Sequence, residues 1–210
     1  MRINKKIAGF IAEGEHQTQD FKYEISDARK IAKTLVAFAN TNGGRLLIGV
    51  KDNGIIKGVK SEEEYYMLET SSLLYCKPKI DIGIEKEWVD GKSVLVAIIK
   101  EGNNKPYYAL NEDERWLAYI RVEDENFLAD IVQLQVWKNK KAKKGVFFKY
   151  TEKEKFLLKY MEIKGDVSLS QTIRLLKINR KNAIHLLAKL VSMDIVEIIF
   201  DTEQTKYALK

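Results

Sequence analysis

The side chains best suited to chemistry lie in the last third of the chain, around position 180. Arginine and asparagine can each make paired hydrogen bonds to a base edge, arginine to guanine and asparagine to adenine. Lysine and histidine beside them add positive or hydrogen-bonding groups that suit a nucleic acid. The sequence therefore predicts a surface that contacts DNA, made of Asn179, Arg180, Lys181, Asn182, His185 and Lys189.

The segment that must position this surface has a helical pattern followed by a stranded one. Thr151 and Glu154 form a capping box, which is typical of a helix start. Three helices and then a hairpin are the pattern of a winged helix-turn-helix, whose third helix enters the major groove through its first residues. The expected elements are helices from Thr151 to the break at Gly165-Asp166, from Ser170 to Leu176 and roughly from Arg180 to Met193, and strands from Ile195 to Phe200 and from Lys206 to Leu209.

The turn of that hairpin favours a different function. Asp201 and Glu203 would repel phosphate groups if the hairpin lay against DNA. Small helical domains of this kind also serve as protein-interaction or dimerisation modules. Both interpretations of the segment therefore stay open, with DNA binding preferred.

Charge is divided unevenly along the chain. Residues 1–136 hold 19 basic and 22 acidic side chains, whereas residues 137–210 hold 17 basic and 8 acidic ones. Attraction for a polyanion should therefore concentrate in the last third. Before it lies a lysine-rich run, interpreted as an exposed linker or as a basic arm that contacts phosphates; its candidate residues are Lys140, Lys141, Lys143 and Lys144.

The first part of the chain reads as mixed α/β. Gln19 to Glu24 alternates polar and apolar residues, as a half-buried strand does, and Ser26 is expected to cap the next helix. That helix should end at the Asn- and Gly-rich segment 40–44. Further strands are expected over Arg45 to Val50, Ile55 to Val59, Lys79 to Trp88, Ser93 to Lys100, Pro106 to Leu110 and Trp116 to Val122. Further helices are expected to begin at Ser61 and to run from Glu125 to Val136.

Several short motifs of this part occur together in one family. The chain resembles the Schlafen/AlbA-2 domain family over about residues 10 to 135, a group associated with DNA binding and also labelled divergent AAA-4 or ATP-binding. One residue departs from the family pattern, because Asp20 stands where the family usually has Glu. The matching residues are Glu15, Asp20-Phe21-Lys22, Ala37-Phe38-Ala39-Asn40-Thr41, Gly43-Gly44, Leu47-Ile48-Gly49-Val50, Asp52 and Gly58, and more weakly Lys105-Pro106-Tyr107-Tyr108 and Ala118-Tyr119-Ile120-Arg121-Val122.

The resemblance implies one enzymatic alternative. Schlafen relatives that cleave RNA use three carboxylates, two of them five residues apart, and Glu15 and Asp20 have that spacing. Asp52 could supply the third, and Lys22 should share a strand face with Asp20. Clustered carboxylates can hold Mg²⁺ or Mn²⁺ for phosphoryl chemistry. A structure that pairs the carboxylates with Lys22 or Arg45 would instead leave a binding domain, and this is the outcome we expect.

Other chemistries find little support. No phosphate-loop motif occurs, since Asn42-Gly43-Gly44-Arg45 lacks the lysine and leads into a strand, so ATP is suggested by the family label alone. The single Cys76 excludes an intramolecular disulfide. The first residues have no signal-peptide pattern and no apolar run is long enough to span a membrane, which predicts a cytoplasmic protein without a membrane partner.

Taken together, the sequence predicts an α+β protein of two domains. The predicted division is a Schlafen/AlbA-2-like domain over 1–136, a basic linker over 137–149 and a winged helix over 150–210. The expected function is a bacterial-type transcriptional regulator that binds duplex DNA as a homodimer on paired half-sites, and no cofactor is expected. A metal-dependent ribonuclease, a nucleotide-binding protein and a protein-interaction adaptor remain alternatives, with RNA as the alternative nucleic acid.

Overall fold

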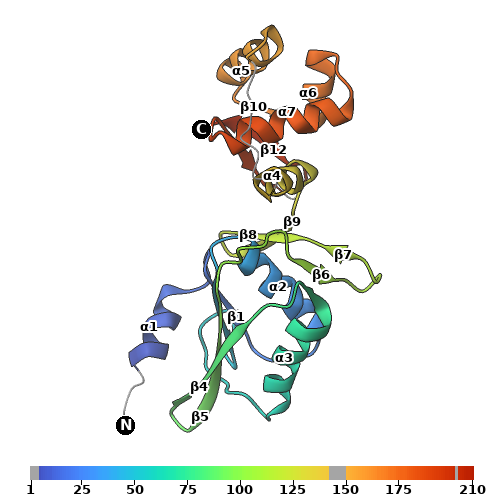
Figure 1. The fold of residues 1–210 in the computed structure, drawn as a ribbon. Helices are drawn as coiled ribbons and strands as arrows, with labels where there is room; N and C mark the ends of the chain where they lie inside the picture. The colour runs from blue at the N-terminus through green and yellow to red at the C-terminus, as the bar shows by residue number, and fades with distance from the viewer. Residues whose placement is uncertain (1–4, 142–149, 202) are drawn as a thin grey trace. The chain divides into compact units, whose positions relative to one another are not determined.

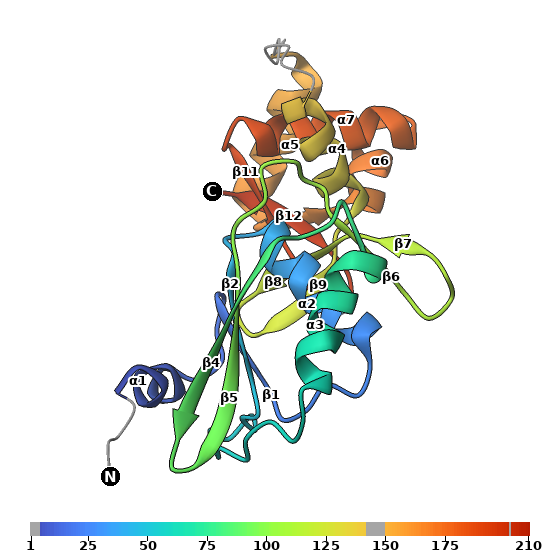
Figure 2. The ribbon, with the colours of Figure 1, turned by 60° about the horizontal axis from the view of Figure 1, so that its bottom comes forward.

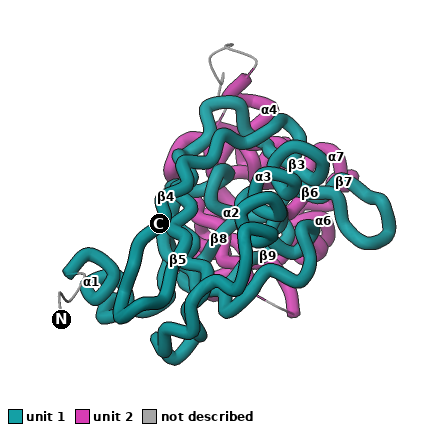
Figure 3. The backbone as a smooth tube through the Cα atoms, turned by 90° about the horizontal axis from the view of Figure 1, so that it is seen from below, with its two compact units in different colours: residues 1–128 teal, residues 129–210 magenta. Residues whose placement is uncertain are grey.

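The computed structural model describes residues 5–141, 150–201 and 203–210 of the chain. The backbone separates into two compact units, Met1–Leu128 and Ala129–Lys210 (Figure 3). Each unit has buried apolar clusters of its own, so the two are described one after the other.

Unit 1 is built on a mixed four-stranded sheet in the order β1-β2-β5-β4. Strands β1 and β2 are parallel, with Asp20 opposite Leu46, whereas β5 runs antiparallel to both of its neighbours. Asp90 and Gly91, both at positive φ, form the two-residue turn between β4 and β5. The elements around this sheet are α1 (Lys5–Glu13), β1 (Gln19–Lys22), α2 (Ala28–Asn40), β2 (Gly44–Ile48), α3 (Glu63–Tyr75), β4 (Ile82–Val89) and β5 (Lys92–Ile99).

Helices cover both faces of this sheet, with α1 on one side and α2 and α3 on the other (Figure 1). The apolar stripe predicted for the second helix is confirmed, because its residues are all buried in the larger cluster: Ile31, Leu35, Val36, Phe38 and Ala39. On the opposite face Ile7 of α1 packs with Phe21 and Leu47. Strand β1 is consequently buried on both faces, and the alternation read from its sequence does not appear in its burial.

Shorter strands complete unit 1. They are β3 (Cys76–Lys77), β6 (Tyr108–Leu110), β7 (Trp116–Leu117), β8 (Tyr119–Val122) and β9 (Glu125–Leu128). The buried side chain of Asn40, at the end of α2, donates to the backbone oxygens of Tyr107 and Tyr119 and accepts from the Tyr107 amide at 2.8 Å. One carboxamide thus ties the helix to two segments that lie far away in the sequence.

Three local predictions for unit 1 are corrected. Asp27 rather than Ser26 caps α2, because its carboxylate accepts from the Arg29 amide at 2.8 Å. Ile55 to Val59 does not form a regular strand, and only an isolated bridge joins Val50 to Ile56. The segment from Glu125 begins as strand β9 and not as a helix, since it pairs with β8.

Unit 2 contains the three helices and the hairpin that the sequence predicts, and adds a helix before them and a strand between them. Strand β10 pairs with β12, which also pairs with β11, all antiparallel. Capping boxes begin two helices, at Thr151 with Glu154 as expected and at Ser168 with Gln171, two residues before the predicted start. The elements are α4 (Ile131–Lys141), α5 (Glu152–Lys164), β10 (Asp166–Ser168), α6 (Leu169–Leu176), α7 (Arg180–Ser192), β11 (Val196–Ile199) and β12 (Lys206–Leu209).

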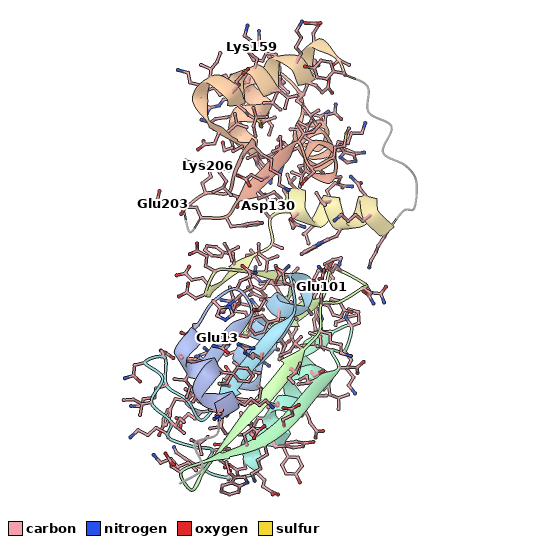
Figure 4. All side chains as sticks on the ribbon, turned by 90° about the vertical axis from the view of Figure 1, so that its left-hand side faces the viewer. Glu13, Glu101, Asp130, Lys159, Glu203 and Lys206 are labelled. Carbon is pink, nitrogen blue, oxygen red and sulfur yellow. The ribbon has the colours of Figure 1, made fainter. Side chains whose placement is uncertain are left out.

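Helix α4 places the boundary between the units earlier than the predicted division after residue 136. Its Val132 and Val136 are buried in the same cluster as Leu187 of α7. Asp130 caps α4 by accepting from the Val132 amide, and its second oxygen accepts from the buried Tyr207 hydroxyl at 2.7 Å (Figure 4). Burial and the Asp130 carboxylate together raise the pKa of the Tyr207 hydroxyl. The helix therefore belongs to the second unit because its apolar face is buried there.

Candidate functional site

The surface predicted around position 180 forms the start of α7. Arg180, Lys181, Asn182 and His185 are exposed, whereas Ala183 between them is fully buried. The buried side of the helix continues through Leu186, Leu187 and Leu190. This periodicity fixes the helix by one face and leaves the polar side chains of its first turns in solvent.

Asn179 has a structural role that the sequence did not assign to it. Its side-chain oxygen accepts a hydrogen bond of 2.8 Å from the Asn182 amide and so caps α7. The residue positions the helix start, and Arg180 and Lys181 follow directly in the first turn. Further along, His185 Nδ1 lies 2.9 Å from the backbone oxygen of Lys181.

Lys189 differs from the other α7 candidates. It is half-buried and lies near Glu154 of α5. Burial acts to raise the pKa of the Glu154 carboxyl, but the hydrogen bond from Thr151, backbone donors and the Lys189 charge together hold it below its ordinary value. Part of the Lys189 charge is therefore already balanced within unit 2.

The lysine-rich run is only partly an exposed linker. Residues 137–141 form the end of α4, where Trp137 is buried at 5% exposure. Lys140 and Lys141 are exposed in the last turn, a favourable place for cations because the helix dipole is negative there. Lys143 and Lys144 lie outside the described residues.

The acidic hairpin turn is present between β11 and β12. Glu203 is exposed, and its amide donates to the Asp201 carboxylate at 3.2 Å (Figure 4). At the base of the hairpin, Lys206 lies 3.4 Å from Asp166 of β10. The hairpin is thus less basic than the α7 surface.

The carboxylate region of unit 1 is organised around Asp20, whose side chain is 4% exposed. One of its oxygens lies 3.0 Å from Lys22 Nζ, and the other lies 3.3 Å from the Arg121 guanidinium. Lys22 also donates to the backbone oxygen of Phe21. The expected ion pair between Asp20 and Lys22 is therefore present, whereas Arg45 pairs with Glu13 instead.

Arg121 belongs to this cluster but was not among the candidate site residues predicted from the sequence. Its side chain is 1% exposed, donates to the Gln19 backbone oxygen at 3.2 Å and to Asn126, and lies over the Phe38 ring. The guanidinium comes from β8, about a hundred positions after β1, so spacing gave no sign of the pairing. The only sign in the sequence that Arg121 matters was its place in the weaker part of the family resemblance, residues 118–122.

Glu15 lies close to Asp20. Its carboxylate accepts from the Phe21 amide at 2.8 Å. Burial and then a hydrogen bond to Asp20 raise the pKa of Glu15 to about 7, because two nearby carboxylates disfavour a second negative charge. Glu15 can therefore hold or release a proton near neutral pH.

Asp52 does not complete a metal site with these two residues. It lies exposed in the turn after β2, where the Gly54 amide donates to the Lys51 oxygen at 2.7 Å. Within the described ranges, no group of three or more His, Cys, Asp or Glu side chains could hold a metal ion. The nuclease alternative required three carboxylates to converge, and Asp52 does not join Glu15 and Asp20 in such a group.

The glycine pair after α2 acts as a helix stop. Gly43 has φ +71°, and its amide donates to the Phe38 oxygen at 2.9 Å. A Cβ atom at Gly43 would lie 2.7 Å from the Ile99 oxygen, so the position also requires glycine for space.

The match to a family of known proteins falls almost entirely in unit 1. The family model described as Schlafen, AlbA_2 matches residues 15–130, more than half of the chain. Among solved structures, the DIP2311 protein from Corynebacterium diphtheriae is 20% identical with a TM-score of 0.47, and the match covers 67% of this chain and 33% of that one. This chain thus spans about a third of that protein.

A second solved structure is the N-terminal domain of a RecG-related protein from Nitrosomonas europaea. It is 22% identical with a TM-score of 0.43, and the match covers 58% of this chain and 89% of that one. No match was found among curated protein sequences. In the described part of the chain, no helix is long and apolar enough to cross a membrane. On the family match over residues 15–130, the chain belongs to the Schlafen, AlbA_2 family.

Proposed function

We propose that this protein binds duplex DNA through α7 and acts as a transcriptional regulator in the cytoplasm. The observation that carries the proposal is the run of exposed polar and basic side chains at the start of a helix whose other face is buried. Arginine and asparagine at such a position can contact base edges, and lysine can contact phosphates. Unit 2 would supply this contact as a winged helix-turn-helix domain.

The order of elements supports the winged-helix assignment. Helices α5, α6 and α7 are followed by the β11–β12 hairpin, and β10 adds a third strand beside β12. In domains of this kind the third helix enters the major groove and the hairpin approaches the backbone. The acidic turn at Asp201 and Glu203 favours a complex in which the tip of the hairpin stays away from phosphates.

Charge supports the same unit. Residues 129–210 hold 17 basic and 9 acidic side chains. Within the described segments, Arg180 and Lys181 make no ion pair with a carboxylate, whereas Asp20 and Lys22 of unit 1 do. Cations without an internal partner are available to replace the counterions of DNA, which makes binding dependent on salt.

The double variant Arg180→Ala with Lys181→Ala tests the proposal. Its affinity for duplex DNA should fall, and the slope of log K against log salt should decrease by roughly 2, one for each lost phosphate contact. Lys159→Ala with Lys164→Ala removes the same charge from exposed positions of α5 and serves as the control; Lys159 is labelled in Figure 4. Equal slopes and affinities in the two double variants would refute α7 as the DNA-binding helix.

Homodimerisation forms part of the proposal. Regulators of this kind bind paired half-sites one helical turn apart, about 34 Å, so that the symmetry of the protein matches that of the operator. Light scattering of the free protein and of its complex with a palindromic duplex would measure the stoichiometry. One chain for each palindrome would contradict the dimer and leave DNA binding untouched.

A further inference from the structure

We infer that unit 1 carries a separate binding site for single-stranded nucleic acid, between the β4–β5 hairpin and the start of α3. A pocket of about 430 Å³ lies there, lined by the segment 57–62 and the end of the hairpin. A second pocket of about 300 Å³ shares Val59, Ser61, Glu62 and Lys86 with it and continues toward Tyr65. Figure 2 shows the β4–β5 hairpin and α3 of unit 1. The two pockets together are called the hairpin groove below.

The hairpin groove concentrates positive charge in a unit whose net charge is slightly negative. Unit 1 holds 19 basic and 21 acidic side chains, yet four exposed lysines line this one groove, namely Lys57, Lys60, Lys86 and Lys92. The acidic groups nearby are Glu62, which also lines the groove, Glu64, which accepts from the Lys60 and Ser61 amides, and Glu24, which lies 2.6 Å from Lys60. The other three lysines against the two remaining carboxylates leave the groove with a net positive charge, as a polyanion site requires.

Aromatic side chains are exposed beside these lysines. Trp88 is 61% exposed on β4 and Tyr66 is 60% exposed on α3, and both line the groove. The Lys86 ammonium lies 5.6 Å from the Trp88 ring, and Tyr65 meets Tyr66 edge to face at 5.9 Å. The exposed faces of these rings are not stabilised by burial, whereas bases can stack on them.

The backbone around the hairpin groove is fixed before any ligand arrives. The Val59 amide donates to the Ser93 oxygen at 2.7 Å, and Lys92 Nζ donates to the Ile56 oxygen at 2.9 Å. Gly58, at φ +83°, lets the segment approach β5 closely, because a Cβ atom there would lie 2.9 Å from the Lys92 side chain. Lys57 and Lys86 make no ion pair among the residues described, so their charges are available.

Stacking rings beside separated cations suit a single strand better than a duplex. In a duplex the bases are stacked on one another and only their edges are accessible, whereas a single strand exposes its base faces. Apart from lysine, few hydrogen-bonding side chains line the groove that could read the edges of bases. We therefore expect binding that depends on salt and on base stacking and that varies little with sequence.

Trp88→Ala in the full chain tests the site. Labelled oligo(dT) and oligo(rU) of about 12 nucleotides, within the usual site size, serve as probes in fluorescence anisotropy. Loss of one stacking platform should weaken binding between about 5-fold and about 150-fold. Trp116→Ala is the matched control, because Trp116 is also exposed in unit 1 and lies near a lysine, Lys77, yet does not line the groove.

Charge removal gives an independent measurement. Lys57→Gln with Lys86→Gln should lower the salt slope for the same oligonucleotides by roughly 1.4, the value for two phosphates of a single strand. Lys30→Gln with Lys100→Gln removes equal charge from other exposed positions of unit 1 and should leave the slope unchanged. Displacement of the probe by poly-glutamate as readily as by unlabelled oligo(dT) would overturn the inference in favour of a general anion surface.

The inference stands apart from the proposal for α7, and the same measurements separate the two. Trp88→Ala should leave duplex binding unchanged, and Arg180→Ala with Lys181→Ala should leave oligonucleotide binding unchanged. Equal affinities of Trp88→Ala and Trp116→Ala for both oligonucleotides would refute the hairpin groove whatever the outcome at α7.

Discussion

The Asp20 cluster of unit 1 and the start of α7 in unit 2 use charge in opposite ways. Around Asp20 the charged groups pair with one another, with the buried Arg121 on one oxygen and the partly exposed Lys22 on the other. At α7 the cations are exposed, and Arg180 and Lys181 have no carboxylate partner in the part of the chain described. Charges that already have an internal partner mainly stabilise the fold, whereas exposed ones remain available to a ligand.

The largest effect is expected from breaking the buried pair. Arg121→Ala should lower the free energy of unfolding of unit 1 by about 3–5 kcal/mol, because it leaves the buried Asp20 charge short of a partner. Urea denaturation would measure the change. Arg115→Ala breaks an exposed pair with Asp113 and should cost less than about 1 kcal/mol, so similar losses in the two variants would contradict the comparison.

A smaller effect is expected from the buried contact of unit 2. Tyr207→Phe removes the hydroxyl that donates to Asp130 and should destabilise unit 2 by about 1.5–3 kcal/mol, the range for a hydrogen bond to a charged group. Tyr160→Phe is the control, since Tyr160 also belongs to unit 2 and is only half-buried. Protection of α4 amides from hydrogen exchange should fall with Tyr207→Phe, and unchanged protection would show that this bond does not hold the helix.

A pH dependence is expected from Glu15. Its pKa rises from 4.5 to about 7 in the folded state, so folding is favoured while Glu15 stays protonated. Stability from this group is full below about pH 4.5 and is lost as the pH rises toward 7. Glu15→Gln should remove that slope in urea titrations. A slope of equal steepness in the variant would assign the pH dependence to other groups.

The smallest effect on stability is expected where the effect on binding is largest. Arg180→Ala with Lys181→Ala should change the free energy of unfolding by no more than about 0.5 kcal/mol, as exposed positions usually do. Thermal melts would measure it beside the DNA titration. A loss of several kcal/mol would mean that these side chains also support the fold, and the contrast with the Asp20 cluster would disappear.

Local patterns predicted the helices of unit 2 well. The capping box at Thr151 and Glu154 and the periodic apolar residues of α7 act within a few positions of one another, so the sequence contains all that they need. The predicted division after residue 136 differs from the division of the backbone after Leu128, for the opposite reason. Helix α4 has a weak pattern of its own, and its place depends on Asp130 meeting Tyr207 from the far end of the chain.

The candidate sites divide along the same line. The exposed side of α7 follows from helical spacing, so Arg180, Lys181 and Asn182 could be named from the sequence. The partners of Asp20 could not all be named. Lys22 lies two positions away on the same strand, but Arg121 comes from β8 and reaches Asp20 only after the chain has folded.

By itself, the sequence determined the α+β class, the family, the stop at Gly43 and the exposed basic start of α7, because each depends on residue types at short spacing. Only the tertiary structure decided that Asp52 stays apart from Glu15 and Asp20, that α4 belongs to unit 2, and that Trp88 and Lys57 line one groove. These outcomes depend on contacts between distant segments. Such contacts form when apolar faces are buried, and no local spacing encodes them.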